Sequence, residues 1–237
     1  MKTYFLTVLA LIVFSFAKAQ TVDEIIAKHT DALGGKDKLL QIKSLYTESS
    51  ISVSGMSGLT KTSVVNGKGY RSESDLGGQV IVQAVNDKGG WQINPFMGST
   101  AATAMSDDEY QLMADNLNIV DPLANYATNG AKVELEGQEK VGDVNAFKIK
   151  YTNKYNKSTE LYIDPTTWFL IKSVTTATIM GQSITTTGSY SNYQKTDYGI
   201  FMPYNLSVDT GQFTLAFTVT KVEVNGTIDP IIFDMPK

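Results

Sequence analysis

The first apolar pattern of the chain has helical spacing. Thr21 and Glu24 stand three residues apart, as in a capping box, where two side chains satisfy free N–H groups at a helix start. Behind them, apolar side chains recur every three or four residues and form one stripe: Val22, Ile25, Ile26, His29 and Leu33. Gly34-Gly35 ends this stripe, because glycine accepts the left-handed conformation that closes a helix. The sequence therefore predicts a helix over 21–33 and a shorter helical turn over 36–42.

After Lys43 the period changes to two, which is typical of strands with one buried face. Leu45, Thr47, Ser49, Ile51 and Val53 alternate with Tyr46, Glu48, Ser50 and Ser52. Gly-Gly, Asn-Gly and Gly/Ser pairs then interrupt the alternation, as the turns of a meander do. The sequence predicts strands near 44–53, 59–66, 69–75, 79–86 and 91–95, with turns at 54–58, 66–67, 77–78 and 89–90.

The alternation disappears between residues 96 and 130. Ser106 and Glu109 form a second capping box, and a short amphipathic stripe that includes Tyr110 and Met113 follows them. Asp121-Pro122 has the pattern of an N-cap followed by proline in the first helical turn. We expect two short helices here, behind a flexible lead-in over 98–105.

Strand alternation then resumes and continues almost to the end of the chain. Val133 and Leu135 alternate with charged residues, and so do Phe147, Ile149 and Tyr151. Further strands are predicted near 158–164, 169–179, 182–195, 204–210 and 212–225. The apolar parity changes within the last of them, so we expect a β-bulge near Thr220. Nothing resembling a linker separates the two blocks, which favours a single mainly β domain over 20–237, one sheet with a helical insertion.

The first nineteen residues predict a cleavable signal peptide. Lys2 supplies a positive charge, residues 4–17 are uncharged and mostly apolar, and Ala17-Lys18-Ala19 places small residues where a signal peptidase needs them. Cleavage before Gln20 would export a soluble protein; the alternative is an uncleaved membrane anchor. Because Gln20 stands where a lipoprotein has its acylated cysteine, we expect no lipid anchor. We expect an exported, periplasmic monomer in a Gram-negative envelope.

Composition narrows the range of partners and reactions. The chain has no cysteine, so an exported domain must be stabilised by its core alone. Its net charge is −4, and loss of Lys2 and Lys18 with the leader would make it more negative by two. The basic residues are not clustered, which argues against a nucleic-acid partner.

Candidates for catalysis and metal binding are few. His29 is the only histidine, and its place on an apolar helical stripe favours a packing role over that of a general base. Zinc ligands are missing in number, and no acidic segment has the EF-hand spacing. Glu134 and Glu136 form a carboxylate pair of a kind that any solvated strand can carry. We therefore expect no catalytic residue, no metal and no cofactor, and hence no enzyme.

Apolar, adaptable side chains gather in and beside the helical insertion. Methionine is unbranched and polarizable, so it repacks around varied apolar partners. Ordinary core packing is the alternative for each residue, but a cluster on an irregular segment favours a ligand-binding lid. The predicted ligand-binding residues are Trp91, Ile93, Phe96, Met97, Met105, Tyr110, Met113, Leu117 and Tyr126.

An ordered set of segments resembles a known family. The segments are ALGGKDKLLQIKSL (32–45), NDKGGWQINPF (86–96), YIDPTTWFLIK (162–172), TDYGIFMPYNL (196–206) and KVEVNGTIDPIIFDMP (221–236). Together they resemble exported outer-membrane lipoprotein-sorting-protein-like proteins, in the wider superfamily of the periplasmic lipoprotein carrier LolA. The resemblance implies a strongly curved antiparallel sheet that forms an incomplete β-barrel, with an N-terminal helix and a helical insertion covering its concave face.

Three functions are consistent with these observations. The resemblance implies a periplasmic carrier or binding protein for a hydrophobic ligand: an acyl chain, a lipid or a lipoprotein. Burial of each CH₂ group of such a ligand contributes about 0.8 kcal/mol, so affinity needs little polar recognition. The alternative is an envelope interaction or sensor module that binds a protein segment in its concave face. A carboxylate-dependent hydrolase is the third, and the carboxylate pair is its sole support.

Overall fold

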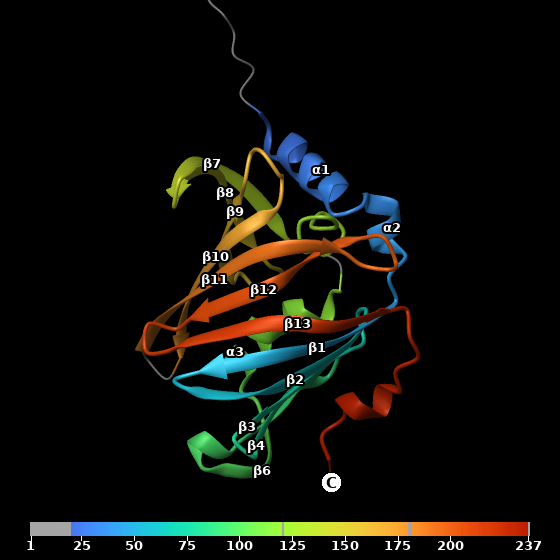
Figure 1. The fold of residues 1–237 in the computed structure, drawn as a ribbon, viewed down its shortest axis with the longest axis vertical. Coiled ribbons are helices and arrows are strands. Elements are labelled where there is room, and N and C mark those ends of the chain that lie inside the picture. The colour runs from blue at the N-terminus through green and yellow to red at the C-terminus, as the bar shows by residue number, and fades with distance from the viewer. Residues whose placement is uncertain (1–19, 120, 180–181, 237) are drawn as a thin grey trace, which may run out of the picture.

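The computed structural model describes residues 20–119, 121–179 and 182–236, and these contain one antiparallel sheet of 13 strands (Figure 1). The predicted leader over 1–19 lies outside the described residues and stays a prediction. The first six strands form a meander: β1 (Ser44–Val53), β2 (Met56–Val65), β3 (Gly69–Leu76), β4 (Gln79–Asn86), β5 (Gly89–Asn94) and β6 (Ser99–Ala104).

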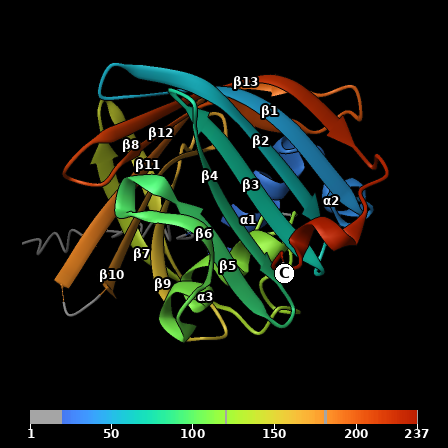
Figure 2. The same cartoon turned by 90° about the horizontal axis from the view of Figure 1, so that it is seen from below.

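The second block of strands belongs to the same sheet. Its members are β7 (Lys132–Val141), β8 (Val144–Thr152), β9 (Ser158–Ile163), β10 (Leu170–Ile179), β11 (Gln182–Lys195), β12 (Phe201–Asp209) and β13 (Thr214–Val224). The order of neighbours is β6-β5-β4-β3-β2-β1-β13-β12-β11-β10-β9-β8-β7. Within the described residues β6 and β7 do not pair, so the curved sheet is a barrel left open (Figure 2). The predicted incomplete barrel is confirmed.

Strands β1 and β13 join the two blocks. Their ladder runs from Leu45 opposite Val224 to Val53 opposite Leu215. The register shifts in the middle of the ladder, where Thr220 is the extra residue and its hydroxyl donates to the carbonyl oxygen of Glu48 over 3.1 Å. The predicted β-bulge is therefore confirmed. It explains the change of parity, because the extra residue turns both ends of β13 toward the same concave face.

The first two helices of the chain lie inside the curve of the sheet. Helix α1 (Val22–Ala32) begins at Thr21, whose side chain accepts from the backbone N–H of Glu24, while the Glu24 carboxylate accepts from that of Thr21. Its stripe packs against β8 and β9 through Ile25 and Ile26. The short helix α2 (Lys36–Leu40) continues this layer. Both predicted helices are confirmed.

The insertion runs from the edge strand β6 to the other edge strand, β7. Helix α3 (Asp107–Met113) begins at the predicted capping box, where Ser106 and Glu109 exchange two hydrogen bonds. A 3₁₀ helix, η2 (Ala114–Leu117), follows directly. Seen from below, the sheet arches over the space that holds α1, α2 and α3 (Figure 2). The insertion therefore covers part of the concave face, as predicted.

Two local predictions within the insertion are wrong. The expected flexible lead-in over 98–105 is strand β6, which pairs with β5 and places Ala104 opposite Trp91. Its small side chains carry no apolar alternation, so the neighbouring strand edge and not the local pattern decides its conformation. The helix expected after Asp121 is a series of turns over 122–130. Its polar side chains bond the local backbone instead, as when the Thr128 hydroxyl donates to the carbonyl oxygen of Asn125.

The C-terminal segment covers the convex face of β3 to β5. It contains a 3₁₀ helix, η3 (Pro230–Phe233), that the sequence did not predict. A Cβ on Gly69 would lie 2.2 Å from the nearest atoms of the Phe233 ring, so only glycine fits there. The Trp91 indole N–H donates to the carbonyl oxygen of Phe233 over 2.9 Å, and the Arg71 guanidinium donates to that of Ile232. Strands β3 and β5 are thus both hydrogen-bonded to the C-terminal segment.

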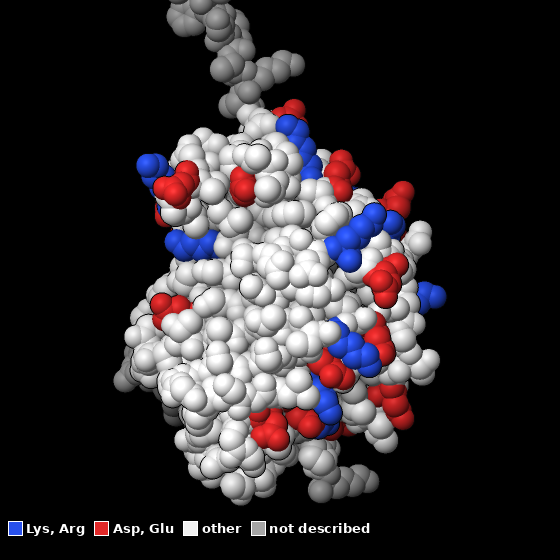
Figure 3. Space-filling view, in the orientation of Figure 1, with Lys and Arg blue, Asp and Glu red and all other residues white. Residues whose placement is uncertain are grey.

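The outer face of the sheet carries few charged side chains near the start of β13, whereas the exposed Lys221 and Glu223 form an ion pair near its end (Figure 3). The outward positions of the first half of β13 are Thr214, Ala216 and Thr218, all exposed and uncharged. Among the described residues, no helix has both the length and the apolar character needed to cross a membrane.

Candidate functional site

A cavity of about 470 Å³ lies between the concave face of the sheet and the layer formed by α1, α2 and the insertion. This volume falls in the usual range for small-molecule sites, about 300–1,000 Å³. Its lining is mostly apolar. The apolar residues are Leu33, Leu39, Ile42, Leu45, Leu112, Ile119, Pro122, Leu161, Leu170, Ile200, Phe201, Met202 and Pro203.

Strand alternation decides which side chains reach this cavity. In β1, Leu45 faces it, and Ile51 shares that face because successive side chains alternate. Their partners in β13, Val224 and Phe217, therefore point inward as well. Beyond the cavity, Phe217 and Leu215 are only partly buried. An apolar strip thus continues from the cavity along the concave face toward the turn between β12 and β13.

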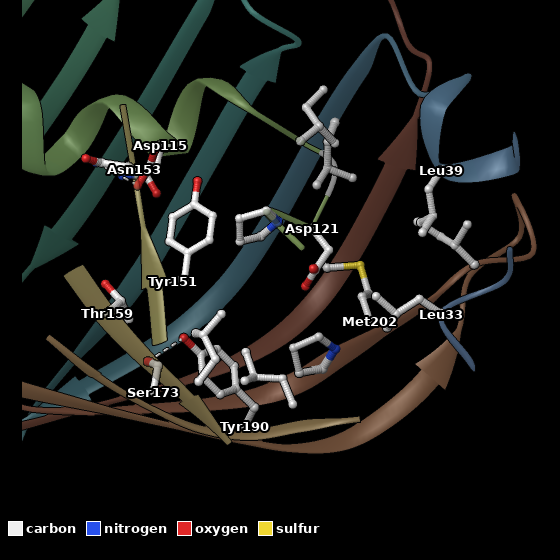
Figure 4. A pocket seen from close by; sticks show the side chains of 18 of the residues that line it. Leu33, Leu39, Asp115, Asp121, Tyr151, Asn153, Thr159, Ser173, Tyr190 and Met202 are labelled. Carbon is white, nitrogen blue, oxygen red and sulfur yellow. Dashed lines mark hydrogen bonds between the residues drawn. The ribbon is translucent and has the colours of Figure 1, made fainter. Parts of the chain in front are cut away.

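One side of the cavity carries polar groups. The side-chain amide of Asn153, in the turn after β8, donates to a carboxylate oxygen of Asp115 in η2 over 3.0 Å. The Asn153 carbonyl oxygen accepts from the backbone N–H groups of Tyr155 and Lys157, which fixes its orientation. Burial raises the pKa of Asp115, although the Asn153 amide and the charge of Lys154 act in the opposite direction. Figure 4 places this pair opposite Leu33 and Leu39 across the cavity.

Three tyrosines on the strands also line the cavity, and they differ in hydrogen bonding. The hydroxyl of Tyr190 shares a hydrogen bond of 3.1 Å with Ser173, and that of Tyr193 donates to the carbonyl oxygen of Leu170 over 2.8 Å. The ring of Tyr151 is buried, and its hydroxyl points toward Asp115 and Asn153 (Figure 4). Among the described residues, the Tyr151 hydroxyl has no hydrogen-bond partner, so it can donate to a ligand.

His29 fastens α1 to two other parts of the fold. Its Nδ1–H donates to the carbonyl oxygen of Trp168 over 2.6 Å. Its Nε2 lies 3.2 Å from Oδ2 of Asp121, an ion-pair distance without hydrogen-bond alignment. The side chain of His29 is 1% exposed, and that of Asp121, which lines the cavity, is 16% exposed.

Electrostatics favour the charged form of both partners. Burial lowers the pKa of His29, but the nearby carboxylate of Asp121 and the Trp168 carbonyl outweigh it, so the pKa lies above its ordinary value. Burial raises the pKa of Asp121, but His29 and the backbone N–H groups of Leu123 and Ala124 bring it below its ordinary value. Sequence reasoning assigned His29 a packing role; the structure adds an ion pair at the cavity wall.

None of the residues predicted to bind ligand belongs to the lining of the cavity. Trp91 and Ile93 belong to a cluster on the convex face, beneath the C-terminal segment. Phe96 and Met97 are exposed in a 3₁₀ turn, η1 (Pro95–Met97), after β5. The remaining five lie in the insertion or at its ends: Met105, Tyr110, Met113, Leu117 and Tyr126. Their contact with a ligand stays a prediction.

Contacts of these five residues tie the insertion to its neighbours. The Met105 sulfur packs over Gly90, and the Tyr110 hydroxyl donates to the carbonyl oxygen of Asn86 over 3.2 Å. The Tyr126 hydroxyl donates to the carboxylate of Asp23 on α1. Met113 and Leu117 are partly buried, next to cavity residues of the same segment, Leu112 and Asn116. Other residues of the insertion line the cavity, and the predicted ones lie beside them in the sequence.

The carboxylate pair of the sequence lies away from the cavity. Glu134 and Glu136 are exposed on the edge strand β7, and Glu136 lies 3.5 Å from the ammonium group of Lys148. The carboxylates that line the cavity are those of Asp115 and Asp121. Within the described ranges, no group of three or more His, Cys, Asp or Glu side chains gathers in a way that would hold a metal ion.

Several solved structures share this architecture over nearly the whole chain. A LolA superfamily protein from Nitrosomonas europaea has a TM-score of 0.57 at 13% identity, over 91% of this chain and 98% of that protein. A DUF1329 family protein from Desulfovibrio piger has a TM-score of 0.58 at 12% identity, over 91% and 98% of the two chains.

A putative outer membrane lipoprotein-sorting protein domain from Vibrio parahaemolyticus is similar as well. Its TM-score is 0.55 at 11% identity, over 89% of this chain and 95% of that domain. No protein-family model matches the sequence, and no curated protein matches it. At these identities the likeness concerns architecture alone. The chain therefore has the fold of LolA superfamily proteins and outer-membrane lipoprotein-sorting domains.

Proposed function

We propose that this protein binds and carries a hydrophobic ligand, an acyl chain of a lipid or lipoprotein, on the concave face of its sheet. The observation that supports this most is the apolar cavity between the sheet and the helical layer. A preformed apolar cavity gains affinity for each CH₂ group it removes from water, about 0.8 kcal/mol. The fold shared with a lipoprotein-sorting domain supports the same proposal. Export through the predicted leader is part of the proposal.

The apolar strip beyond the cavity supports a ligand with a long chain. Phe217 and Leu215 of β13 and Leu206 and Val208 of β12 share the concave face and are only partly buried. A partly exposed apolar surface that continues a cavity is typical of a binding groove. We infer that a chain longer than the cavity extends along this strip.

Two neighbouring residues of β10 provide a matched test. Thr175 lines the cavity, whereas Thr176 is exposed on the opposite face of the same strand. A Thr175→Trp variant places an indole in the cavity, and Thr176→Trp adds the same side chain outside it. Uptake of the neutral dye Nile red should fall sharply in the first variant and stay near the wild-type level in the second. Equal uptake by both would show that the dye binds elsewhere and contradict the proposal.

Native mass spectrometry of the protein purified from its own cell envelope identifies the natural ligand. Lipid that co-purifies with wild type and is lost in Thr175→Trp supports a carrier. A specific protein partner retained without lipid would instead favour the interaction or sensor module.

A further inference from the structure

The cavity has an apolar side and a polar side. Figure 4 shows Leu33 and Leu39 on one side, Asp115 and Asn153 on the other, and Asp121 between them beside Met202. Such a division suits an amphiphile, whose chain and head group need different surroundings. The groups on the polar side would therefore contact the head group of the ligand, and their chemistry predicts which head group fits.

Two polar atoms on that side have no hydrogen-bond partner in the part of the chain that the structure describes. One carboxylate oxygen of Asp115 accepts from Asn153, but among the described residues its other oxygen has no hydrogen-bond partner. The Tyr151 hydroxyl, which points toward Asp115, has none in the same residues. Together they offer one donor and one acceptor. A hydroxyl group can accept from Tyr151 and donate to Asp115 at once.

The charges around the cavity disfavour an anionic head group. Asp115 and Asp121 both line it, and their charges contribute to the raised pKa of Tyr151 after the effect of burial. The ammonium group of Lys157, a cation of the lining, lies 2.9 Å from Asp108 and is already paired. His29 faces Asp121. Asp115 has no ion-pair partner within 4 Å among the described residues, and only the more distant charge of Lys154 acts on it, so a ligand carboxylate placed beside Asp115 would meet a like charge.

We propose that the ligand is an amphiphile with an uncharged head group that carries a hydroxyl or amide donor, held between Tyr151 and Asp115. This inference rests on the proposed function, since the same cavity holds the chain. Leu33 and Leu39 receive the end of the chain, and the head group fills the hydrogen bonds left open at the polar side. A fatty-acid anion of equal chain length is bound more weakly than its glycerol ester.

Displacement of Nile red by two ligands with the same chain separates the head group from the chain. Monolaurin is uncharged and bears hydroxyl groups, whereas laurate is an anion at neutral pH. Below their micelle concentrations, monolaurin should displace the dye at a concentration about tenfold lower than laurate, equivalent to about 1.4 kcal/mol. Equal displacement, or better displacement by laurate, overturns the head-group inference and leaves the proposed function intact. Failure of Nile red to bind wild type overturns both.

Variants assign the selectivity to residues. Tyr151→Phe should weaken monolaurin about tenfold relative to the Nile red affinity measured in the same variant, and so reduce the preference for monolaurin over laurate, because it removes one hydrogen bond to the uncharged head. Tyr193→Phe is the matched control. Tyr193 lines the same cavity, but its hydroxyl already donates to the carbonyl oxygen of Leu170, so the preference for monolaurin over laurate should remain in this variant. Asp115→Asn should reduce the difference between the concentrations at which monolaurin and laurate displace the dye. This second variant keeps the test decisive if Tyr151→Phe is poorly folded. Selectivity that survives both Tyr151→Phe and Asp115→Asn contradicts the proposal.

Discussion

At the scale of single residues, the ion pair of His29 and Asp121 is the most consequential contact in the helical layer. It joins α1 to the insertion, and the Nδ1–H bond to Trp168 joins α1 to the turn between β9 and β10. Trp168 itself has a positive φ of 62°, which costs free energy for a residue with a side chain. A single buried histidine therefore holds together three segments that are far apart in the sequence.

Replacement of His29 by Gln should destabilise the protein by about 2 kcal/mol, because it leaves the Asp121 carboxylate without its cation. Urea unfolding at neutral pH measures this loss. Asp121→Asn and the double variant complete a mutant cycle, in which contacting residues show non-additive losses. Losses that simply add would mean that the two side chains do not interact.

The same pair predicts a pH dependence with a definite sign. The pKa of His29 is raised in the folded state, so the stabilisation it contributes is complete below its ordinary pKa of about 6.5 and is lost as pH rises through the raised value. The pKa of Asp121 is lowered, so its contribution is lost as pH falls through that lowered value. The stability difference between wild type and His29→Gln should therefore shrink on going to alkaline pH. A stability difference that grows at alkaline pH would contradict a protonated His29 paired with an ionised Asp121.

At the scale of elements, the C-terminal segment and the insertion both act as covers, one on each face of the sheet. Phe233 is buried over Gly69, while Ile231 two residues earlier is 68% exposed. Met113 and Leu117 of the insertion are partly buried on the concave side. The degree of burial predicts a structural role for the first cover and a functional role for the second.

Replacement of Phe233 by Ala should cost about 3 kcal/mol, as expected for loss of a fully buried ring. Ile231→Ala, in the same 3₁₀ helix, should change stability by less than about 0.5 kcal/mol. Urea unfolding followed by tryptophan fluorescence measures both, and Trp91 reports locally because its indole donates to the carbonyl oxygen of Phe233. A similar loss in both variants would show that the segment is not anchored by its buried ring.

The insertion should matter more for binding than for folding. We expect a Met113→Ala, Leu117→Ala double variant to lose only about 1 kcal/mol of stability, since partly buried side chains have few fixed contacts to lose. Its uptake of Nile red should fall well below that of wild type. A large drop in melting temperature, with uptake per folded molecule unchanged, would identify both residues as ordinary core and refute the lid.

The sequence predicted the elements whose apolar period and end signals agree. The capping boxes at Thr21 and Ser106 located two helices, and a change of parity located the bulge at Thr220. Local signals failed for β6, whose conformation depends on its neighbour, and for the turns after Asp121. The cavity lining was out of reach for a related reason: a strand pattern shows that two faces exist, but only the curvature of the whole sheet shows which one is concave.

At the scale of the whole molecule, two structures connect the strand blocks. The ladder between β1 and β13 is continuous apart from the bulge. The insertion forms a second bridge: the backbone N–H of Gly67, between β2 and β3, donates to the carbonyl oxygen of Leu117, while Asp115 accepts from Asn153 after β8. The two blocks are therefore connected through the insertion as well as through the ladder. We infer that residues 20–237 behave as one cooperative domain.

The two tryptophans allow a direct test of this inference, because one lies in each block. Trp91 is in β5, and Trp168 lies in the turn between β9 and β10. The Trp168→Phe variant therefore reports on the first block, and Trp91→Phe reports on the second. In each variant, the fluorescence transition in urea should coincide with that of far-ultraviolet circular dichroism, as expected for two-state unfolding. Comparison within a variant removes the effect of the substitution on stability. If the fluorescence of either block changed at a clearly different urea concentration from the dichroism, the blocks would be separate folding units, and the open barrel would be two domains joined at β1 and β13.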